Sequence, residues 1–537
     1  SLYVESIEFR QDRKCNMKQV IQSLKTGATE TVEVPAPKVR TGHLLVQTHV
    51  SLVSAGTERM LKSFGEAGLI AKARQQPDKV RMVIDKIATD GLLPTVESVR
   101  QKLDQPIPMG YCNAGEVIDV GPGVTGYSIG DRVVSNGHHA ELVCVPANLC
   151  AKIPDSVPYE AAAFSVLGAV ALQGIRLSKP TLGETFMVTG LGLVGLLAVQ
   201  LLRAHGCKVL ASDFDPSRVL LAQSFGAEAI DLSSGSDPVA AAEIFTRGRG
   251  VDGVLITAST DSDAPVQEAA KMCRKRGRIT LVGVTGLNLS RDEFYKKELT
   301  FQVSCSYGPG RYDPLYEEQG QDYPLPYVRW TEQRNFEAVI DMMASGGVHT
   351  GPLVTDRFVI AEATNAYEKL DDRASLGILL DYPDRESVLG LDVCLRIIPE
   401  VSSSTPSERI HIGVIGAGAF AERTLIPALC KGPGFLKTIS SANGLNAARI
   451  ARKFGIAEAT GDTDLIMNDP EIGLVVIATP HDSHADLVCQ ALRAQKHVFV
   501  EKPLAITREQ LKSVEDVAGS VEAARAMVLV GFNRRFS

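Results

Sequence analysis

The sequence predicts an α/β fold in which two parallel sheets each carry a glycine-rich turn. The first turn, GLGLVG over residues 190–195, follows the strand-like run Thr185–Thr189. The second, GAGAFA over residues 416–421, follows the strand-like run Ile410–Ile415. Each turn opens a helix-like run, and strand and helix patterns alternate beyond it, which is typical of a parallel sheet with helices on both faces.

Both turns have the chemistry of a phosphate-binding site. A glycine permits the tight passage from strand to helix, and a position without a side chain lets a pyrophosphate approach the backbone. The N-terminus of the following helix then offers N–H groups and a partial positive charge. We therefore expect two dinucleotide-binding units in tandem, with contacts from Gly190, Gly192, Leu193, Val194 and Gly195 in the first and from Gly416, Gly418, Ala419 and Phe420 in the second.

Length and composition limit the class of protein. The chain has 537 residues, enough for roughly three to four domains of about 150 residues. Its formal net charge of -7 argues against a nucleic-acid partner, and no long uncharged apolar run predicts a membrane span. Its ten cysteines are scattered without a CxxC motif, which suits reduced thiols in a cytoplasmic protein.

The patterns divide the chain into segments. The insertion within the first domain is charged and has helical spacing, and it is either a packing or oligomerisation flap or a lid over a substrate. Because the sequence stops abruptly after the strand-like Met527–Gly531, we expect the natural protein to continue. The predicted order is an N-terminal extension (1–16), a β-rich domain (17–155) with a helical insertion (59–108), the first dinucleotide-binding domain (156–300), a return to the β-rich domain (301–383), a linker (384–409) and the second dinucleotide-binding domain (410–537).

Asp213 ends the second predicted strand of the first unit, a short distance after its glycine turn. A carboxylate there accepts hydrogen bonds from the ribose hydroxyls and repels a 2′-phosphate, so it favours NAD over NADP. The alternative role for Asp213 is to cap the helix that follows Asp215-Pro216. Arg218, within that helix, is a further candidate cofactor contact.

Short stretches along residues 17–383 resemble the medium-chain dehydrogenase/reductase family. That resemblance implies a GroES-like, β-rich catalytic domain joined to a Rossmann domain, with a cleft between them and an oxidoreductase activity. It also implies a homo-oligomer, a dimer or a tetramer. The matching stretches are Ala114–Val117 with Val120-Gly121, Gly130–Val133, Ala140–Val143, the 190–195 turn and Phe225–Ala227.

The sequence departs from the zinc-dependent branch of that family. Ala55 stands where the resemblance places a ligand cysteine, and Tyr111 stands where it places a ligand histidine. Ala163-Phe164-Ser165 lies near the third ligand position, and the four-cysteine structural loop is absent. Catalytic zinc needs three protein ligands and one open position, so we predict no metal. The remaining cluster of potential ligands is Cys112, His138 and His139, whose spacing matches no known site.

Without zinc, hydroxyl or N–H groups must polarise the substrate oxygen. Thr57 occupies the family's proton-relay position, and Tyr111 lies beside it in the resemblance. We take both as candidate catalytic hydrogen-bond donors, with purely structural hydrogen bonding as the alternative. The loop Cys305–Tyr312 combines two tyrosines with an arginine, and it is either a clamp for a sugar or phosphate-bearing ligand or a packed interdomain loop.

Residues 410–537 carry a second resemblance, through the 416–421 turn, Ala478-Thr479-Pro480, His484 and Glu501-Lys502-Pro503. They are similar to the N-terminal half of the glucose–fructose oxidoreductase and inositol dehydrogenase family. The resemblance implies that Lys502 lies near the nicotinamide and helps move a substrate proton. It places Thr479, Pro480, His484 and Glu501 at the cofactor cleft.

Two departures qualify the second unit. Its second strand ends in Ser440–Asn443 without a carboxylate, so either NAD or NADP is expected there. The substrate-binding domain that follows in the family is absent from this sequence.

From both units together, we predict a zinc-independent NAD(P)-dependent oxidoreductase that acts on a small carbonyl or alcohol, with a sugar or nucleotide sugar as the candidate substrate. The alternatives are a quinone or enoyl reductase and a dinucleotide-binding sensor without turnover.

Overall fold

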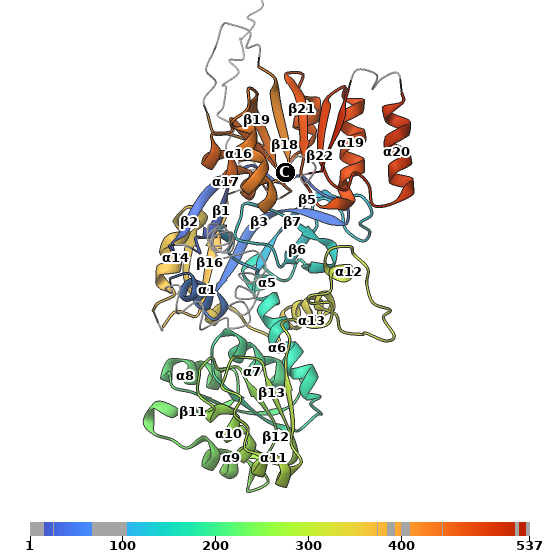
Figure 1. Ribbon diagram of the computed structural model, residues 1–537. Helices are drawn as coiled ribbons and strands as arrows, with labels where there is room; N and C mark the ends of the chain where they lie inside the picture. The colour runs from blue at the N-terminus through green and yellow to red at the C-terminus, as the bar shows by residue number, and fades with distance from the viewer. Residues whose placement is uncertain are drawn as a thin grey trace, which may run out of the picture. The chain divides into compact units, whose positions relative to one another are not determined.

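The computed structural model describes residues 16–24, 26–66, 105–372, 374–383, 393–398, 409–442, 444–520 and 526–532 (Figure 1). The side chains at 57, 63, 64 and 66 are also outside this description. The chain forms two compact units. The larger unit contains Gln19–Thr31 and Val39–Pro383, and the smaller unit contains residues 16–18, Val32–Lys38 and the described residues from Val393 onward.

The β-rich part of the larger unit is built around the long strand β3 (His43–Ser54). The sheet order is β15-β16-β3-β5-β6-β8, and β7 also pairs with β3. Strands β3 and β5 approach so closely that a Cβ on Gly115 would lie 1.9 Å from the carbonyl oxygen of Gln47. The other strands are β5 (Asn113–Val120), β6 (Arg132–Ser135), β7 (Leu142–Pro146), β8 (Cys150–Lys152), β15 (Val354–Val359) and β16 (Gly377–Asp381), with a separate sheet of β2 (Thr29–Val34), β1 (Met17–Gln22) and β4 (Ile107–Pro108).

The segment from β9 to β14 forms a parallel six-stranded sheet in the order β11-β10-β9-β12-β13-β14. The first strand along the chain, β9, therefore lies between β10 and β12, where the order reverses. Such a switch point opens a crevice at the carboxyl ends of the strands. The strands are β9 (Thr185–Thr189), β10 (Lys208–Asp213), β11 (Glu228–Asp231), β12 (Val251–Ile256), β13 (Cys273–Leu281) and β14 (Thr300–Val303), connected by α7 (Leu193–Ala204), α8 (Pro216–Ser224), α9 (Pro238–Thr246), α10 (Ala264–Met272) and α11 (Arg291–Lys297).

The smaller unit repeats this topology in the order β17-β20-β19-β18-β21-β22-β23. Only β17 is antiparallel, and β18 lies at the switch point between β19 and β21. The strands are β17 (Cys394–Arg396), β18 (His411–Ile415), β19 (Phe435–Ser440), β20 (Glu458–Thr460), β21 (Ile472–Ile477), β22 (His497–Glu501) and β23 (Val528–Gly531), and the helices are α16 (Ile426–Leu429), α17 (Leu445–Phe454), α18 (Asp464–Asn468), α19 (His484–Arg493) and α20 (Arg508–Ala518).

One hydrophobic core runs through both parts of the larger unit. It includes Leu52 and Phe164 beside the β-rich sheet and Val188 and Leu196 in the Rossmann part, all fully buried. This shared core joins the two sheets within one unit. The remaining helices of the larger unit are α1 (Thr57–Glu66), α5 (Tyr159–Ala162), α6 (Ser165–Ser178), α12 (Pro314–Glu317), α13 (Glu332–Ala344) and α14 (Ala363–Lys369).

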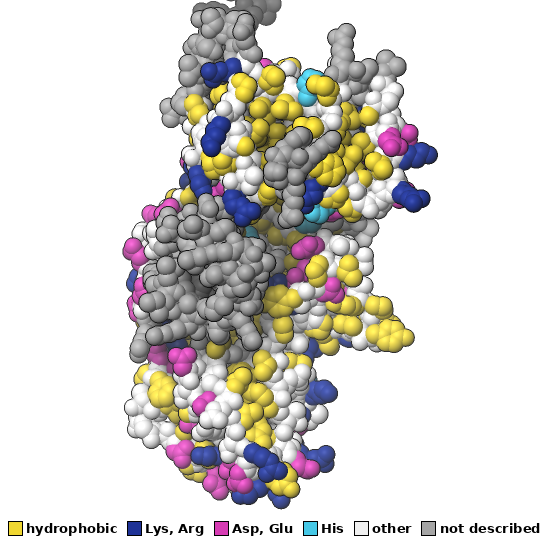
Figure 2. Space-filling view, viewed as in Figure 1, with side chains coloured by type: hydrophobic (Ala, Val, Ile, Leu, Met, Phe, Trp, Pro, Cys, Tyr) yellow, Lys and Arg dark blue, Asp and Glu magenta, His cyan; other side chains and the backbone are white. Residues whose placement is uncertain are grey.

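The predicted fold class is confirmed: a β-rich domain and a Rossmann domain are followed by a second Rossmann domain. No described helix is long and apolar enough to cross a membrane. Figure 2 shows Lys and Arg side chains interspersed with Asp and Glu on the face in view. Several predicted segments lie outside the described residues: the extension at 1–15, the insertion at 67–104, most of the linker and the chain end at 533–537.

Candidate functional site

The first glycine turn connects β9 to α7, and two of its glycines are sterically required. Gly190 has a φ of 94°, and a Cβ there would lie 2.7 Å from the backbone nitrogen of Ala258. A Cβ on Gly195 would lie 2.0 Å from the carbonyl oxygen of Gly190. Thr257 Oγ1 donates a hydrogen bond to that same oxygen at 2.6 Å. The turn is thus held tightly against the end of β12.

Gly192 is different, because no atom lies within 4 Å of a Cβ built on it. Its backbone is extended, and it is the N-cap of α7 without a side-chain capping bond. The missing side chain therefore leaves open space in front of the N-terminus of a 12-residue helix. That space suits a pyrophosphate, which would accept hydrogen bonds from the first N–H groups of α7.

Asp213 lies at the end of β10 and holds the glycine turn in place. Its Oδ2 accepts a hydrogen bond from the Leu191 N–H at 2.6 Å, and its Oδ1 accepts one from the Asp215 N–H at 2.9 Å. The capping role considered for Asp213 is wrong, because Asp215 is the N-cap of α8 and accepts from the Ser217 N–H at 2.9 Å. Arg218 lies in α8, with its Nε 3.5 Å from Asp215 Oδ2.

The second glycine turn repeats this division of roles. Gly416 has a φ of 110°, and a Cβ there would lie 2.3 Å from the carbonyl oxygen of Ala478. Gly418 has no atom within 4 Å of its Cβ position. Ala419 and Phe420 begin a helix that continues as a π-helical turn over Ala421–Leu425. This turn too combines a crowded first glycine with an open second one.

Around Lys502, His484 connects the two loops that the sequence predicts at the cofactor cleft. The ring is fully buried, with Nδ1 2.7 Å from the carbonyl oxygen of Pro503 and Nε2 3.0 Å from that of Thr479. Burial raises the pKa of Glu501, at the end of β22, while Lys502 lowers it. His484 therefore connects the loop of Thr479 to the loop of Pro503 through their backbone carbonyl groups.

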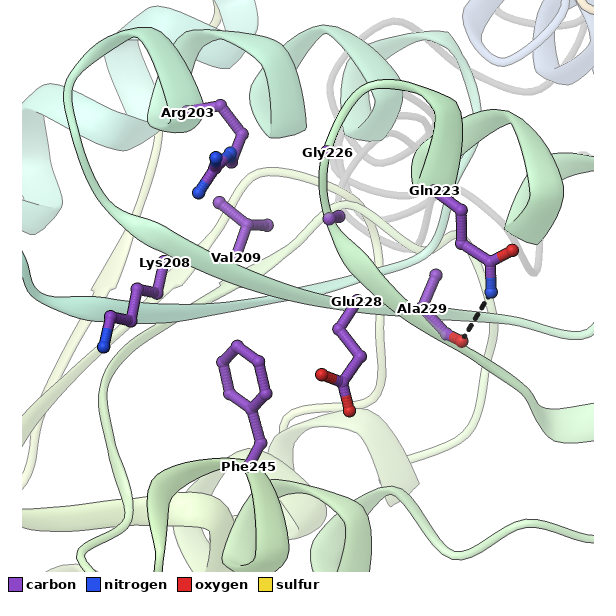
Figure 3. A pocket seen from close by; sticks show the side chains of 9 residues that line it. Arg203, Lys208, Val209, Gln223, Gly226, Glu228, Ala229 and Phe245 are labelled. Carbon is purple, nitrogen blue, oxygen red and sulfur yellow. Dashed lines mark hydrogen bonds between the residues drawn. The ribbon is translucent and has the colours of Figure 1, made fainter.

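Each unit has a pocket of similar size, but only one lies at a carboxyl edge. The pocket in the smaller unit, of about 550 Å³, adjoins Lys502 beyond the ends of β22 and β23. The pocket of about 540 Å³ in Figure 3 lies beside Lys208 and Glu228, at the amino ends of β10 and β11. It is on the edge opposite the glycine turn, so it does not form part of the dinucleotide site. The apolar residues around Lys502 are Pro503, Leu504, Ala505, Ile506, Leu511, Val530 and Phe532.

The predicted catalytic pair of the first module is only partly described. Thr57 begins α1, and its side chain lies outside the described residues. Tyr111 is half-buried and packs against the large core. Lys502 belongs to the smaller unit, so it is considered separately. The catalytic roles of all three residues remain predictions.

The three potential metal ligands Cys112, His138 and His139 do not come together in one site. Cys112 is fully buried, and this burial, together with Glu58, raises the pKa of its thiol well above the usual range. His138 Nδ1 lies 2.9 Å from the carbonyl oxygen of Gly110. His139 Nε2 instead faces Glu58 Oε2 at 3.2 Å. Within the described ranges, no three His, Cys, Asp or Glu side chains are arranged to hold a metal ion.

Sequence reasoning missed this buried polar group around Glu58. Glu58 contacts His139 and Tyr367, and His139 contacts Ser51, which contacts Tyr382. The one available signal was a glutamate that directly follows the candidate donor Thr57. The partners of Glu58, His139 and Tyr367, lie 81 and 309 residues away along the sequence, so residue spacing could not identify them.

The side chains and backbone of the loop Cys305–Tyr312 contact neighbouring residues of the same unit, which is typical of a packed loop. Arg311 Nη1 bonds Glu317 Oε1 at 2.5 Å, and its guanidinium lies 4.3 Å from the centre of the Tyr312 ring. Asn335 Nδ2 donates to the Tyr307 carbonyl oxygen at 2.8 Å. Glu332, at the start of α13, is fully buried beneath this loop, and neither carboxyl oxygen has a hydrogen-bond partner among the described residues.

Comparison with known proteins agrees with this architecture. Residues 83–155 match the alcohol dehydrogenase GroES-like domain, residues 194–319 match zinc-binding dehydrogenases, and residues 410–532 match the oxidoreductase family with an NAD-binding Rossmann fold. The (R,R)-butanediol dehydrogenase of Bacillus subtilis is 36% identical over 176 residues, which are 27% of this chain and 50% of that protein. This chain thus spans half the length of that relative.

A further relative and a solved structure cover more of the chain. The sorbitol dehydrogenase of Bacillus subtilis is 25% identical over 316 residues, which are 53% of this chain and 83% of that protein. The crystal structure of 2R,3R-butanediol dehydrogenase from Bacillus subtilis has a TM-score of 0.52 at 22% identity and covers 69% of this chain and 100% of its own. This structural likeness shows the fold.

The fold, the two glycine turns and the domain matches define the class as NAD(P)-dependent oxidoreductase. Within that class, residues 83–155 and 194–319 are similar to the two domains of medium-chain dehydrogenases, and residues 410–532 are similar to the Rossmann domain of the glucose–fructose oxidoreductase and inositol dehydrogenase family. Both resemblances inferred from the sequence are thereby confirmed.

The role of Gly192 and Gly418 in nucleotide binding can be tested by replacing each with a residue that has a side chain. Gly192→Val adds a Cβ at a position that has no protein atom within 4 Å, so the melting temperature should stay near that of the wild type. NADH binding at the first site should weaken by at least about tenfold, or ~1.4 kcal/mol, because the side chain displaces the pyrophosphate. Calorimetric titration should then show one site fewer, and Gly418→Val should remove the other. Gly351→Val, at another open glycine, is the control, and unchanged titrations in both turn variants would contradict the assignment.

Glu332 gives a pH-dependent prediction. Burial and the nearby Glu317 raise its pKa from 4.5 to about 8. The folded protein thus keeps a proton that the unfolded chain releases, and stability falls as pH rises from about 4.5 to about 8. Glu332→Gln should stabilise the larger unit at pH 8.5 by on the order of 3 kcal/mol and have little effect at pH 5. Denaturation at both pH values, with the exposed Glu368→Gln as control, tests this; an equal effect at both pH values would refute it.

Proposed function

We propose that the first module is a zinc-independent, NAD-dependent dehydrogenase that acts on an alcohol or carbonyl group of a sugar or nucleotide sugar. The observation that carries this proposal is the open Gly192 at the N-terminus of α7, with Asp213 bonded to the same turn. A bound nicotinamide would supply or accept the hydride. The polypeptide must bind the coenzyme, orient the substrate and stabilise the charge on its oxygen.

The preference for NAD rests on Asp213. Each carboxylate oxygen accepts one backbone hydrogen bond and retains a further lone pair for a ribose hydroxyl. The carboxylate would repel a 2′-phosphate at the same place. In the second module, β19 ends at Ser440, and its neighbour Ser441 accepts a hydrogen bond from the Ala447 N–H through Oγ at 3.1 Å. Because no carboxylate stands there, we propose NAD or NADP for that module.

Zinc independence is supported by the residues at the family's ligand positions. The methyl group of Ala55 offers no donor atom to a metal, and Tyr111 replaces an imidazole. We propose that Tyr111 and Thr57 instead donate hydrogen bonds to the substrate oxygen, stabilising it as charge develops during hydride transfer. In the second module, Lys502 would serve the same oxygen-binding role beside its apolar pocket.

The substrate class is supported by the relatives. The similar proteins are named as dehydrogenases of butanediol and of sorbitol, which are both small polyols. A quinone or enoyl reductase would prefer NADPH, against which Asp213 argues. We also propose a cytoplasmic location, which the scattered cysteines suit, and a homo-oligomer, which the family resemblance implies.

Coenzyme choice provides one test. Asp213→Ser should weaken NADH binding by about tenfold, or ~1.4 kcal/mol, and NADPH binding by less, because the ribose acceptor is lost together with the charge that repels a 2′-phosphate. Asp213→Asn is the matched variant, since it keeps the size of the side chain. Fluorescence titration with both coenzymes measures the effect. An equal loss for both coenzymes would remove Asp213 from the ribose role.

Turnover tests the function directly. The chain, dialysed against a chelator, should oxidise at least one member of a panel of polyols, sugars and nucleotide sugars with NAD, and elemental analysis should find less than one zinc per chain. Activity that survives in Gly418→Val but not in Gly192→Val would assign it to the first module. Tight nucleotide binding without turnover would favour a sensor, and a stoichiometric, essential zinc would overturn the metal-free proposal.

A further inference from the structure

A buried hydrogen-bonded cluster surrounds Glu58, three residues after Ala55, the position that the sequence resemblance aligns with a zinc ligand. Glu58, Ser51 and His139 are all buried, with relative exposures of 0%. Glu58 Oε1 accepts from the Ser54 N–H at 2.9 Å, and Glu58 Oε2 lies 3.2 Å from His139 Nε2. The hydroxyl of the buried Tyr367 bonds the same Oε2 atom. Glu58 is thus surrounded by three groups that can donate.

The hydrogen-bonded cluster continues from the Nδ1 atom of His139. His139 Nδ1 lies 2.7 Å from Ser51 Oγ, which lies 2.7 Å from the Tyr382 hydroxyl. The ring also packs directly under the backbone of Gly110, where an added Cβ would lie 2.6 Å from it. Gly110 directly precedes Tyr111. The His139 ring therefore supports the backbone of the segment that carries the candidate donor.

The donors and acceptors around Glu58 can be matched in two ways. With Glu58 ionised, the Ser54 N–H, the Tyr367 hydroxyl and a proton on His139 Nε2 all find an acceptor. A protonated Glu58 would donate to Nε2 and force the proton of His139 onto Nδ1. The two states therefore differ in which ring nitrogen carries a proton.

The cluster also reaches toward Tyr111. Burial raises the pKa of Tyr367, and Glu58 and Tyr111 raise it further, while Ala55, just before the first turn of α1, packs against the same small core as Tyr367. Glu58 therefore links the turn that carries Thr57, through Tyr367 and His139, to the segment of Tyr111. These groups come from α1, β3, α14 and the turn before β7, so only the folded larger unit assembles them.

We propose that Glu58 is the positioning residue of the first module: fully buried, it accepts hydrogen bonds from His139 Nε2 and from the Tyr367 hydroxyl, and through them it fixes Tyr111 in place of a metal centre. The link to catalysis rests on the function proposed above. The positioning itself does not, so it can be measured in the free protein. Glu58 does not touch the substrate in this proposal; it acts through its partners.

The decisive measurement is nuclear magnetic resonance on the whole chain, with ¹⁵N-labelled histidine and ¹³C-labelled tyrosine. His139 should carry its proton on Nε2, with its signal assigned through His139→Gln. Glu58→Gln, which keeps the size but removes the charge, should shift the His139 tautomer toward Nδ1 and move the ring signal of Tyr111. Glu30→Gln, at an exposed glutamate of β2, is the matched control and should change neither.

A milder variant covers the case in which Glu58→Gln does not fold. Tyr367→Phe removes one hydroxyl and keeps the ring, and it should move the Tyr111 signal while His139 keeps its Nε2 proton. With a substrate found by the turnover panel, Glu58→Gln should lower kcat by at least about tenfold, or ~1.4 kcal/mol in the barrier, and leave the KM for coenzyme unchanged.

Three results would overturn the proposal: a His139 that carries its proton on Nδ1 in the wild type, a Tyr111 signal that neither variant moves, or an unchanged kcat in Glu58→Gln. If the wild type turns over no substrate, the proposed function fails, and the magnetic resonance signals alone decide the role of Glu58. Failure of the function and failure of the positioning are thereby distinguishable.

Discussion

The close approach of backbone segments at two switch points is the constraint on which both nucleotide units depend. A parallel strand must pass into its helix between two neighbouring strands, and the chain has room there only without a side chain. Gly190 meets Ala258 in the larger unit, and Gly416 meets Ala478 in the smaller one. In each turn the first glycine is required because it is crowded, and the second glycine faces open space. Fold and ligand site therefore arise from the same local geometry.

The two units differ in what surrounds this common geometry. In the larger unit, Asp213 bonds the N–H of Leu191, so the acidic group expected at the ribose also stabilises the turn. In the smaller unit, the Gly416 N–H donates to the backbone oxygen of Ser440, and among the residues that the structure describes no carboxylate bonds this turn. Instead, the buried His484 ties together the loops of Thr479 and Pro503 next to an apolar pocket. The same topology thus supports two differently built coenzyme edges.

The sequence was sufficient to predict local features. Strand, turn and helix are adjacent along the chain at 185–204, so hydrophobic period and glycine spacing indicated the fold and the cofactor edge. The cluster around Glu58 could not be predicted this way, because Ser51 and Tyr382 are 331 residues apart and meet only when β16 pairs with β3. The capping role considered for Asp213 failed for a simpler reason: Asp215 directly precedes the helix and caps it.

The cluster also explains how this fold tolerates a polar interior beside its candidate active site. A buried hydroxyl or carboxylate without a partner destabilises the folded state by about 1–3 kcal/mol or more. Here Glu58, His139, Ser51, Tyr367 and Tyr382 bond one another. A second series of hydrogen bonds runs from Asn113 Nδ2 to Thr48 Oγ1 at 2.7 Å and from Thr48 Oγ1 to the Ala140 carbonyl oxygen at 2.6 Å. Ala140 directly follows His139, so this second chain of hydrogen bonds holds the backbone that presents the imidazole to Glu58. A metal ion would hold such a site together through its ligands; in this protein, hydrogen bonds between side chains from distant parts of the sequence can do the same.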